Sequence, residues 1–140
     1  MKSFKQYILE NEEPFVAGVF GDGKHNYSVN RLIQHTRGKT PTMMSVADLV
    51  KKNAETETHE GNFGENIKNP SKEFSARVAR ADIQYPILVH DSGWIIDGSH
   101  RLAKLHSMGA SHANVHVLTD EDLKHAIITS EEEFEKAKNV

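Results

Sequence analysis

The sequence predicts an α+β fold in which a small mixed sheet is flanked by helices. Short apolar runs typical of strands alternate with stretches whose apolar residues recur at helical spacing. The middle of the chain reads strand, strand, helix, strand, with helical segments before and after it. The chain has 140 residues, 37% of them hydrophobic, which is enough for one domain with one modest core.

The first thirteen residues stand apart from the rest. Apolar residues recur there at helical spacing, and an acidic run followed by Pro14 ends the pattern. We therefore expect a separate helical segment over 1–13, to which a resemblance described below adds a targeting role, and the folded domain over 14–140.

In the first half of that domain, serine residues stand where helices should begin, since a serine hydroxyl accepts a hydrogen bond from the first helical turn. The expected elements are a strand over 15–20, a helix over 29–37 capped by Ser28, a strand over 41–46, and a helix over 47–54 capped by Ser45. Residues 53–70 are polar and rich in Gly and Asn, which predicts a long loop. Its acidic residues over 55–65 are candidates to cover a site, as long loops often do.

The second half carries the clearest strand and helix signals. The expected elements are a helix over 72–81 capped by Ser71, strands over 84–90 and 93–97 joined by the turn 91–93, a helix over 99–108 ended by Gly109, a strand over 113–119, and short helices over 120–128 and 130–139. Two strands, a helix and a third strand in this order predict a small sheet with the helix packed on it.

Composition excludes several classes of function. The chain has no cysteine, which removes disulfides, thiol catalysis and Cys-based zinc sites. It has no apolar run of membrane-spanning length and no secretory signal pattern, so a cytoplasmic protein without a membrane partner is expected. The net charge of −3 argues against strong non-specific binding to nucleic acid.

The charges are nevertheless unevenly spread. Residues 24–52 carry six Lys/Arg and one acid, a net +5, and residues 68–80 carry four Lys/Arg and one acid, a net +3. Residues 119–135 carry seven acids and one Lys, a net −6. If both basic blocks fold onto one face, they form a phosphate-attracting surface, whereas ordinary scatter of surface charge is the simpler interpretation.

The stretch WIIDGSHRLAKLHSMG, residues 94–109, is the most informative part of the chain. A strand ends and a helix begins at Asp-Gly-Ser-His-Arg, where a plain connection needs only a turn and a cap. The free N–H groups and positive dipole of a helix start bind anions, above all phosphate. The sequence therefore predicts a phosphate site at this junction.

Each residue type at the junction suits phosphate chemistry. Glycine allows close approach of the backbone, arginine offers a bidentate fork, histidine acts as acid or base, and an aspartate holds Mg²⁺ or accepts a proton. The candidate catalytic residues are Asp97 and His100, the candidate metal ligand is Asp97, and the candidate nucleotide contacts are Gly98, Ser99, His100, Arg101 and Lys104. In the structural alternative, Asp97 or Ser99 is only a cap, His100 is a surface residue and Arg101 pairs with Asp97.

Residues 86–118, PILVHDSGWIIDGSHRLAKLHSMGASHANVHVL, resemble the ParB/sulfiredoxin-like superfamily, and within it small ParB-like proteins with a DG-x-HR motif. The resemblance covers roughly residues 26–128. It implies a single ParB/sulfiredoxin-like domain that binds nucleotide phosphates through Gly98 to Arg101. Asp97 matches an acidic residue implicated in the kinase-like members. The expected cofactors are thus a nucleoside triphosphate, ATP or CTP, and Mg²⁺.

Two departures from that superfamily narrow the activity. The sulfinic acid reductases need a cysteine in this turn, where this chain has Ser99, so their chemistry is excluded. The partition proteins carry a GERR-type box, where this chain has DGSHR. They also carry a DNA-binding domain, for which 140 residues leave no room. The favoured hypothesis is a nucleotide-dependent triphosphatase or phosphotransferase; a nucleic-acid binder or nuclease using the basic blocks is a less favoured alternative.

The first ten residues, MKSFKQYILE, resemble the capsid-targeting peptide of internal head proteins in T-even-type bacteriophages, with cleavage after Glu10. The resemblance implies a protein held in the virion interior and then delivered to the host cytoplasm. It also implies a further alternative function, in which the protein binds and blocks a host defence protein. A helix that docks on the domain through Phe4, Tyr7 and Ile8 is the structural alternative.

Overall fold

The computed structural model describes residues 18–21, 24–58 and 60–138, which group into two compact units. One unit is Thr40–Leu118, and the other consists of the described residues of Met1–Lys39 and Thr119–Val140. The described residues form seven helices and, among their strands, a four-stranded mixed sheet, so the expected mixture of helices around a small mixed sheet is confirmed. The segment expected over 1–13 lies outside the described residues.

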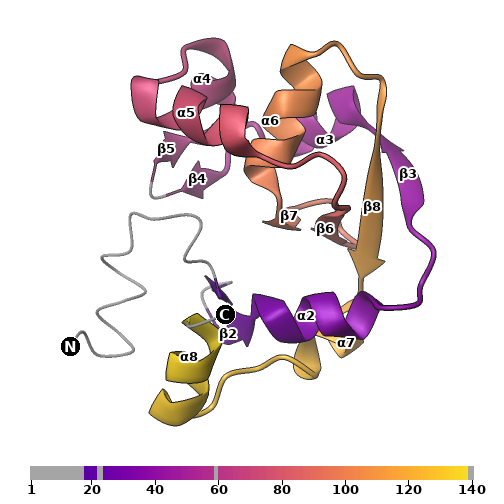
Figure 1. Cartoon of the computed structure of the whole chain (residues 1–140), viewed down its shortest axis with the longest axis vertical. Coiled ribbons are helices and arrows are strands. Elements are labelled where there is room, and N and C mark those ends of the chain that lie inside the picture. The colour runs from indigo at the N-terminus through magenta and orange to yellow at the C-terminus, as the bar shows by residue number, and fades with distance from the viewer. Residues whose placement is uncertain (1–17, 22–23, 59, 139–140) are drawn as a thin grey trace. The chain divides into compact units, whose positions relative to one another are not determined.

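The unit Thr40–Leu118 contains the four-stranded sheet and four helices of the described chain (Figure 1). Its elements in chain order are β3 Thr42–Ser45, α3 Val46–Asn53, β4 Glu57–Thr58, β5 Gly61–Asn62, α4 Phe63–Lys68, α5 Lys72–Arg80, β6 Ile87–His90, β7 Ile95–Asp97, α6 Ser99–Ser107 and β8 His112–Leu118.

The sheet has the strand order β3-β8-β6-β7. The pairs β3–β8 and β6–β7 are antiparallel, whereas β6 and β8 run parallel. A parallel pair needs a crossover, and here the chain passes through β7 and α6 between β6 and β8. The start of α6 therefore follows directly from the edge strand β7.

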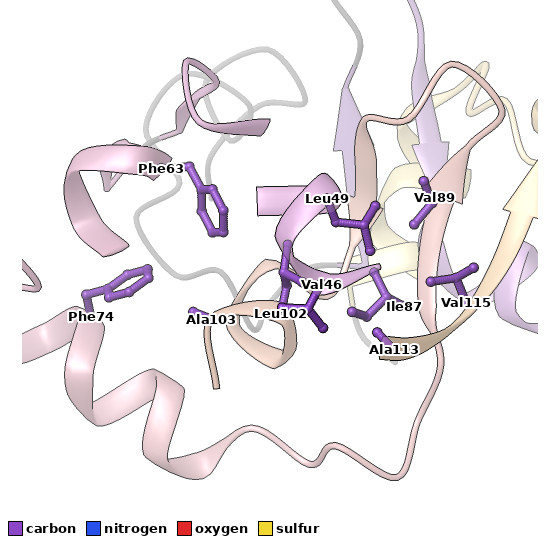
Figure 2. Close-up of a cluster of buried hydrophobic side chains, with 10 residues drawn as sticks. All are labelled: Val46, Leu49, Phe63, Phe74, Ile87, Val89, Leu102, Ala103, Ala113 and Val115. Atoms are coloured by element: carbon purple, nitrogen blue, oxygen red, sulfur yellow. The ribbon is translucent and has the colours of Figure 1, made fainter. Parts of the chain in front are cut away.

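The core of this unit lies between the sheet and the helices. Strands β6 and β8 contribute one side, α3 and α6 the other, and α4 and α5 add one phenylalanine each (Figure 2). The buried residues are Val46, Leu49, Phe63, Phe74, Ile87, Val89, Leu102, Ala103, Ala113 and Val115. Burial of an aliphatic or aromatic side chain stabilises a fold by about 1.5–3 kcal/mol, and α6 contributes the fully buried Leu102 to this core.

The buried amide of Asn53 joins α3 to the β6–β7 hairpin. Its Nδ2 donates to the carbonyl oxygens of Leu49, at 2.8 Å, and Gly93, at 3.1 Å. Its Oδ1 accepts from the backbone N–H of Ile95 at 3.0 Å. With these contacts the amide is well satisfied, and it sets the position of the strand that leads into α6.

The three serine caps expected from the sequence are confirmed. Ser28, Ser45 and Ser71 each accept a hydrogen bond from the backbone N–H three residues later. The corresponding helices begin directly after these residues. Strand β6 starts later than expected, at Ile87, since Pro86 has no N–H to donate to a sheet.

The prediction of a long loop over 53–70 is wrong. This segment holds the hairpin β4–β5 and the helix α4, whose cap is Asn62. Phe63 is buried in the core, and Gly64 approaches so closely that a Cβ there would lie 2.5 Å from the carbonyl oxygen of Ala54. The polar composition of this segment did not predict its hairpin and helix, which the burial of Phe63 and the close approach of Gly64 to the end of α3 hold in place.

The second unit contains β1 Val19–Gly21, β2 Asn26–Ser28, α2 Val29–Thr36, α7 Asp120–Lys124 and α8 Glu131–Lys138. Strands β1 and β2 pair antiparallel, and Phe134 is fully buried in a small cluster with Ile128 and Ala137. The expected helix over 120–128 ends at Lys124, because residues 126–128 instead exchange backbone hydrogen bonds with β2. No helix in the described part of the chain combines the length and apolarity needed to cross a membrane.

Candidate active site at the start of α6

The turn from β7 into α6 is made by Gly98. Its φ is +113°, a conformation that side-chain-bearing residues rarely adopt, and it is the N-cap residue of α6. Ser99 is the first residue of the helix, so the interpretation of Ser99 as the cap is wrong. Because glycine has no side chain, the N-cap residue accepts no side-chain hydrogen bond from the first turn of α6.

This start differs from every other helix start in the described chain. The other six helices have a side-chain oxygen that accepts from a backbone N–H of the first turn; these oxygens belong to Ser28, Ser45, Asn62, Ser71, Thr119 and Ser130. Only α6 begins at a glycine. The N-cap residue of α6 therefore offers no side chain to the first-turn N–H groups.

Asp97 and Arg101 form an ion pair across this turn. Arg101 Nη2 donates to Asp97 Oδ2 at 2.7 Å, and Nη1 donates to the carbonyl oxygen of Pro86 at 2.7 Å. The pairing in the structural alternative is thus confirmed. The guanidinium also lies over Gly98, where a Cβ would be 3.1 Å from Arg101 Nε and Nη2. The positive φ favours glycine here, and an added Cβ would force the arginine side chain to shift by a few tenths of an ångström.

His100 belongs to a buried polar network centred on Glu60. Its Nε2 lies 2.8 Å from Glu60 Oε1, and Arg77 Nη1 donates to Glu60 Oε2 at 2.7 Å. The side chains of His100, Glu60 and Arg77 are only 9%, 11% and 14% exposed. The alternative that made His100 a surface residue is wrong. The ring also packs against Phe74, with centroids 5.4 Å apart.

The network joins three elements of the unit Thr40–Leu118. Glu60 lies in the β4–β5 turn, Arg77 on α5 and His100 in the first turn of α6. A carboxylate hydrogen-bonded to one ring nitrogen of a histidine fixes the orientation of the ring. Glu60 therefore positions the His100 ring in the first turn of α6.

Lys104 makes contacts that differ from those of Arg101. Its Nζ donates to the carbonyl oxygens of Ala79 and Ala81, each at 2.9 Å, at the carboxyl end of α5. An ammonium there satisfies carbonyl groups that a helix end leaves open and suits the negative end of the dipole. Lys104 and Arg101 share α6, but each holds a different segment of the chain.

The sequence alone did not single out two members of this site. Arg77 lies in the basic block 68–80 without any local feature that distinguishes it. Glu60 is one of the acids over 55–65 that the sequence predicts could cover a site, with nothing to distinguish it from the others. Glu60 lies 17 positions from Arg77 and 40 positions from His100 in the chain, so no local spacing pattern connects these residues.

The metal-binding capacity of the described residues is limited. They contain no group of three or more His, Cys, Asp or Glu side chains arranged to hold an ion. Mg²⁺ needs fewer protein ligands, because it keeps several waters and is bound by one or two carboxylates together with substrate phosphates. In the structure, the carboxylate of Asp97, the expected metal ligand, is paired with Arg101.

No family model matches the chain, and neither the curated proteins nor the solved structures include a significant match. The sequence motif and the geometry of the β7–α6 junction are thus the basis for assigning a function.

Proposed function

We propose that this chain is a ParB/sulfiredoxin-like protein that binds a nucleoside triphosphate, ATP or CTP, at the start of α6 and acts as a triphosphatase or phosphotransferase. The observation that carries the proposal is the pairing of two features at one place. Helix α6 begins without a side-chain cap, and its first turn contains a buried histidine held by Glu60. The DG-x-HR resemblance supports the same assignment.

Phosphate binding is assigned to the first turn of α6 and to Arg101. The N–H groups of Gly98, Ser99 and His100 are donors of the kind that cradle phosphate oxygens. A phosphate carries the same type of acceptor oxygen as the Asp97 carboxylate, so it can replace Asp97 as the partner of Arg101 Nη2. Pro86 would keep Nη1 in place during that exchange.

Proton transfer is assigned to His100. When the acceptor hydroxyl or a water attacks the γ-phosphorus, its proton passes to the imidazole, and the bond to the nucleoside diphosphate breaks. Glu60 would stabilise the imidazolium that forms. Asp97, released from Arg101, would bind Mg²⁺ together with the phosphates, and the ion supplies charge neutralisation.

Calorimetric titration tests the binding step. Purified protein is titrated with ATP, CTP, GTP and UTP, with and without Mg²⁺, beside Arg101→Gln and a matched control, Arg80→Gln. Arg80 is an exposed arginine on α5 of the same unit. We expect binding of ATP or CTP by the wild type and by the control, with at least a ten-fold loss in Arg101→Gln. Equal affinity of all three proteins would remove the phosphate site from α6.

Phosphate release tests the catalytic step. His100→Gln should lower kcat by at least 100-fold while the nucleotide Kd changes little, because proton transfer and not binding is lost. Thermal unfolding of the variant separates loss of chemistry from loss of fold. If the variant is folded and retains full turnover, His100 is not the base.

A second candidate function is that of a bacteriophage internal head protein that is injected with the DNA and blocks a host defence protein. The observation that favours it is the sequence MKSFKQYILE, which has the character of a capsid-targeting peptide. Terminal sequencing of the protein recovered from virions tests it. A start at Asn11 is expected, and a start at Met1 or absence from virions would contradict it.

The nucleic-acid alternative has weaker support. The basic block 24–52 is divided between the two compact units, residues 24–39 in one and 40–52 in the other. Duplex retardation at low salt tests it, since binding through these charges must weaken steeply as salt rises.

A further inference from the structure

A pocket lies between α4, α5 and α6 in the unit Thr40–Leu118. It has a volume of about 350 Å³. Much of its wall is apolar, formed by Ile67, Phe74, Val78, Ala103 and Met108. The polar residues along the same wall are Asn66, Ser75, Lys104, His106 and Ser107. The pocket therefore combines an apolar interior with a small number of hydrogen-bonding groups, as ligand sites do.

Lys104 gives the pocket a fixed positive charge. Ala79, whose carbonyl oxygen accepts from the ammonium, also lines the pocket, which places the charge at the pocket wall. An ammonium has three N–H donors, and the carbonyl oxygens of Ala79 and Ala81 use two. Among the described residues, no carboxylate forms an ion pair with Lys104. One donor and a full positive charge are thus open to an anion.

We propose that this pocket binds a small amphipathic anion, with its apolar body between α4, α5 and α6 and its acidic group on Lys104. The apolar wall selects a body of one or two rings or a short acyl chain, since the volume is at the lower end of the range for ligand pockets. The charge selects a carboxylate, sulfonate or phosphate monoester. This site does not depend on nucleotide binding at the start of α6.

Two fluorescent probes test both parts of the proposal. Anilinonaphthalene sulfonate has an anionic group on an aromatic body, and N-phenylnaphthylamine has the same ring system without the charge. On the folded full-length chain, the sulfonate should bind saturably with one-to-one stoichiometry and about ten-fold more tightly than the neutral probe. Equal affinity for the two probes, or no saturable binding of the sulfonate, would overturn the proposal.

Variants locate the probe. Ser75→Trp and Ser107→Trp place a bulky side chain at the pocket wall from two different helices, and either should abolish binding of both probes. Lys104→Met should reduce the affinity for the sulfonate to that of the neutral probe and leave the neutral probe unchanged. Lys51→Met, which removes an exposed lysine from α3, is the matched control and should change neither.

The folding of each variant is checked by thermal unfolding, because Lys104 also holds the end of α5. If Lys104→Met does not fold, the two tryptophan variants and the comparison of probes on the wild type still decide the outcome. Unchanged binding of the sulfonate in both folded tryptophan variants would place the probe elsewhere and reject the site. ATP binding that falls in Arg101→Gln but is retained in the two tryptophan variants reports on the α6 start and not on this pocket.

Discussion

The first turns of helices α6 and α7 are held in place by different kinds of contact. At α7, Thr119 and Asp122 form a capping box: the Thr119 hydroxyl accepts from the Asp122 N–H, and the Asp122 carboxylate accepts from the Thr119 N–H at 2.8 Å. At α6, the N-cap residue is Gly98, and the ordering contacts come from Glu60 and Pro86, which lie 40 and 15 positions from their partners. The start of α7 is thus capped by its own residues, whereas the start of α6 is held by residues distant in the sequence.

The difference separates a structural helix start from a candidate functional one. A capping box satisfies two backbone donors with side chains three residues apart, and leaves no donor for a ligand at those positions. A glycine start held by distant residues has no capping side chain of its own, while its charged side chains are fixed in position. Predictions that weaken one type of contact at a time can test this contrast.

The largest effect is expected from Glu60→Ala, which removes the carboxylate that joins His100 and Arg77. Loss of one partner from a buried charged network should lower the free energy of unfolding by about 3 kcal/mol. Urea denaturation followed by the fluorescence of Trp94, the one tryptophan of the chain, measures it in the unit Thr40–Leu118. Glu57→Ala, an exposed glutamate of the same hairpin, is the matched control; equal losses in both variants would contradict the role of the network.

Gly98→Ala should have the next largest effect. The positive φ strains any residue with a Cβ, and that Cβ would meet the Arg101 side chain, so we expect a loss of about 2 kcal/mol. Nucleotide binding should fall together with stability. Gly109→Ala separates the two causes, because Gly109 also has a positive φ, of 73°, but a Cβ there has no neighbour within 4 Å. We therefore expect a smaller loss of stability in Gly109→Ala than in Gly98→Ala. A Gly98→Ala variant with wild-type stability and binding would show that the turn does not need glycine.

Thr119→Ala tests the opposite kind of start. Loss of a threonine cap should lower the free energy of unfolding by about 1 kcal/mol. Because Thr119 belongs to the unit without the tryptophan, the change is measured by far-ultraviolet circular dichroism. Nucleotide affinity should be unchanged, and a fall in affinity as large as that of Gly98→Ala would erase the distinction between the two helix starts.

The smallest effect concerns the acid stability of the α7 start. Burial raises the pKa of Asp122, but hydrogen bonds from the Thr119 backbone, from His35 and from the Thr119 hydroxyl outweigh it and lower the pKa to about 2. The carboxylate thus contributes stability above its unfolded pKa of about 4, and this contribution is lost as the pH falls towards 2.

Asp122→Asn should therefore show a flatter dependence of stability on pH between about 4 and 2. The difference from the wild type in the free energy of unfolding should be less than about 1 kcal/mol, because the Asp122–His35 pair is partly exposed to solvent. Urea midpoints of the wild type and the variant over this range provide the measurement. Glu121→Gln, an exposed neighbour, serves as control and should follow the wild type. Parallel curves for wild type and Asp122→Asn would contradict the assigned pKa.

The serine caps illustrate how far local sequence determined the fold. Ser28, Ser45 and Ser71 mark the helices that follow them because a cap and its first-turn partner are three residues apart. The segment 53–70 shows where such reasoning failed. Its order depends on Phe63 reaching the core and on Gly64 approaching Ala54, and neither contact leaves a periodic signal in the chain.

By itself, the sequence determined the class of fold, the positions of most helices and strands, and the place of the Asp97–Arg101 junction, since caps, glycines and apolar periodicity act over a few residues. Only the tertiary structure decided which charges meet there. It brought Glu60 and Arg77 to His100, turned Arg101 towards Asp97 and Pro86, and moved Lys104 to the end of α5. The physical reason is that an ion pair depends on distance in space, which the packing of α5, α6 and the β4–β5 hairpin sets and no local pattern encodes.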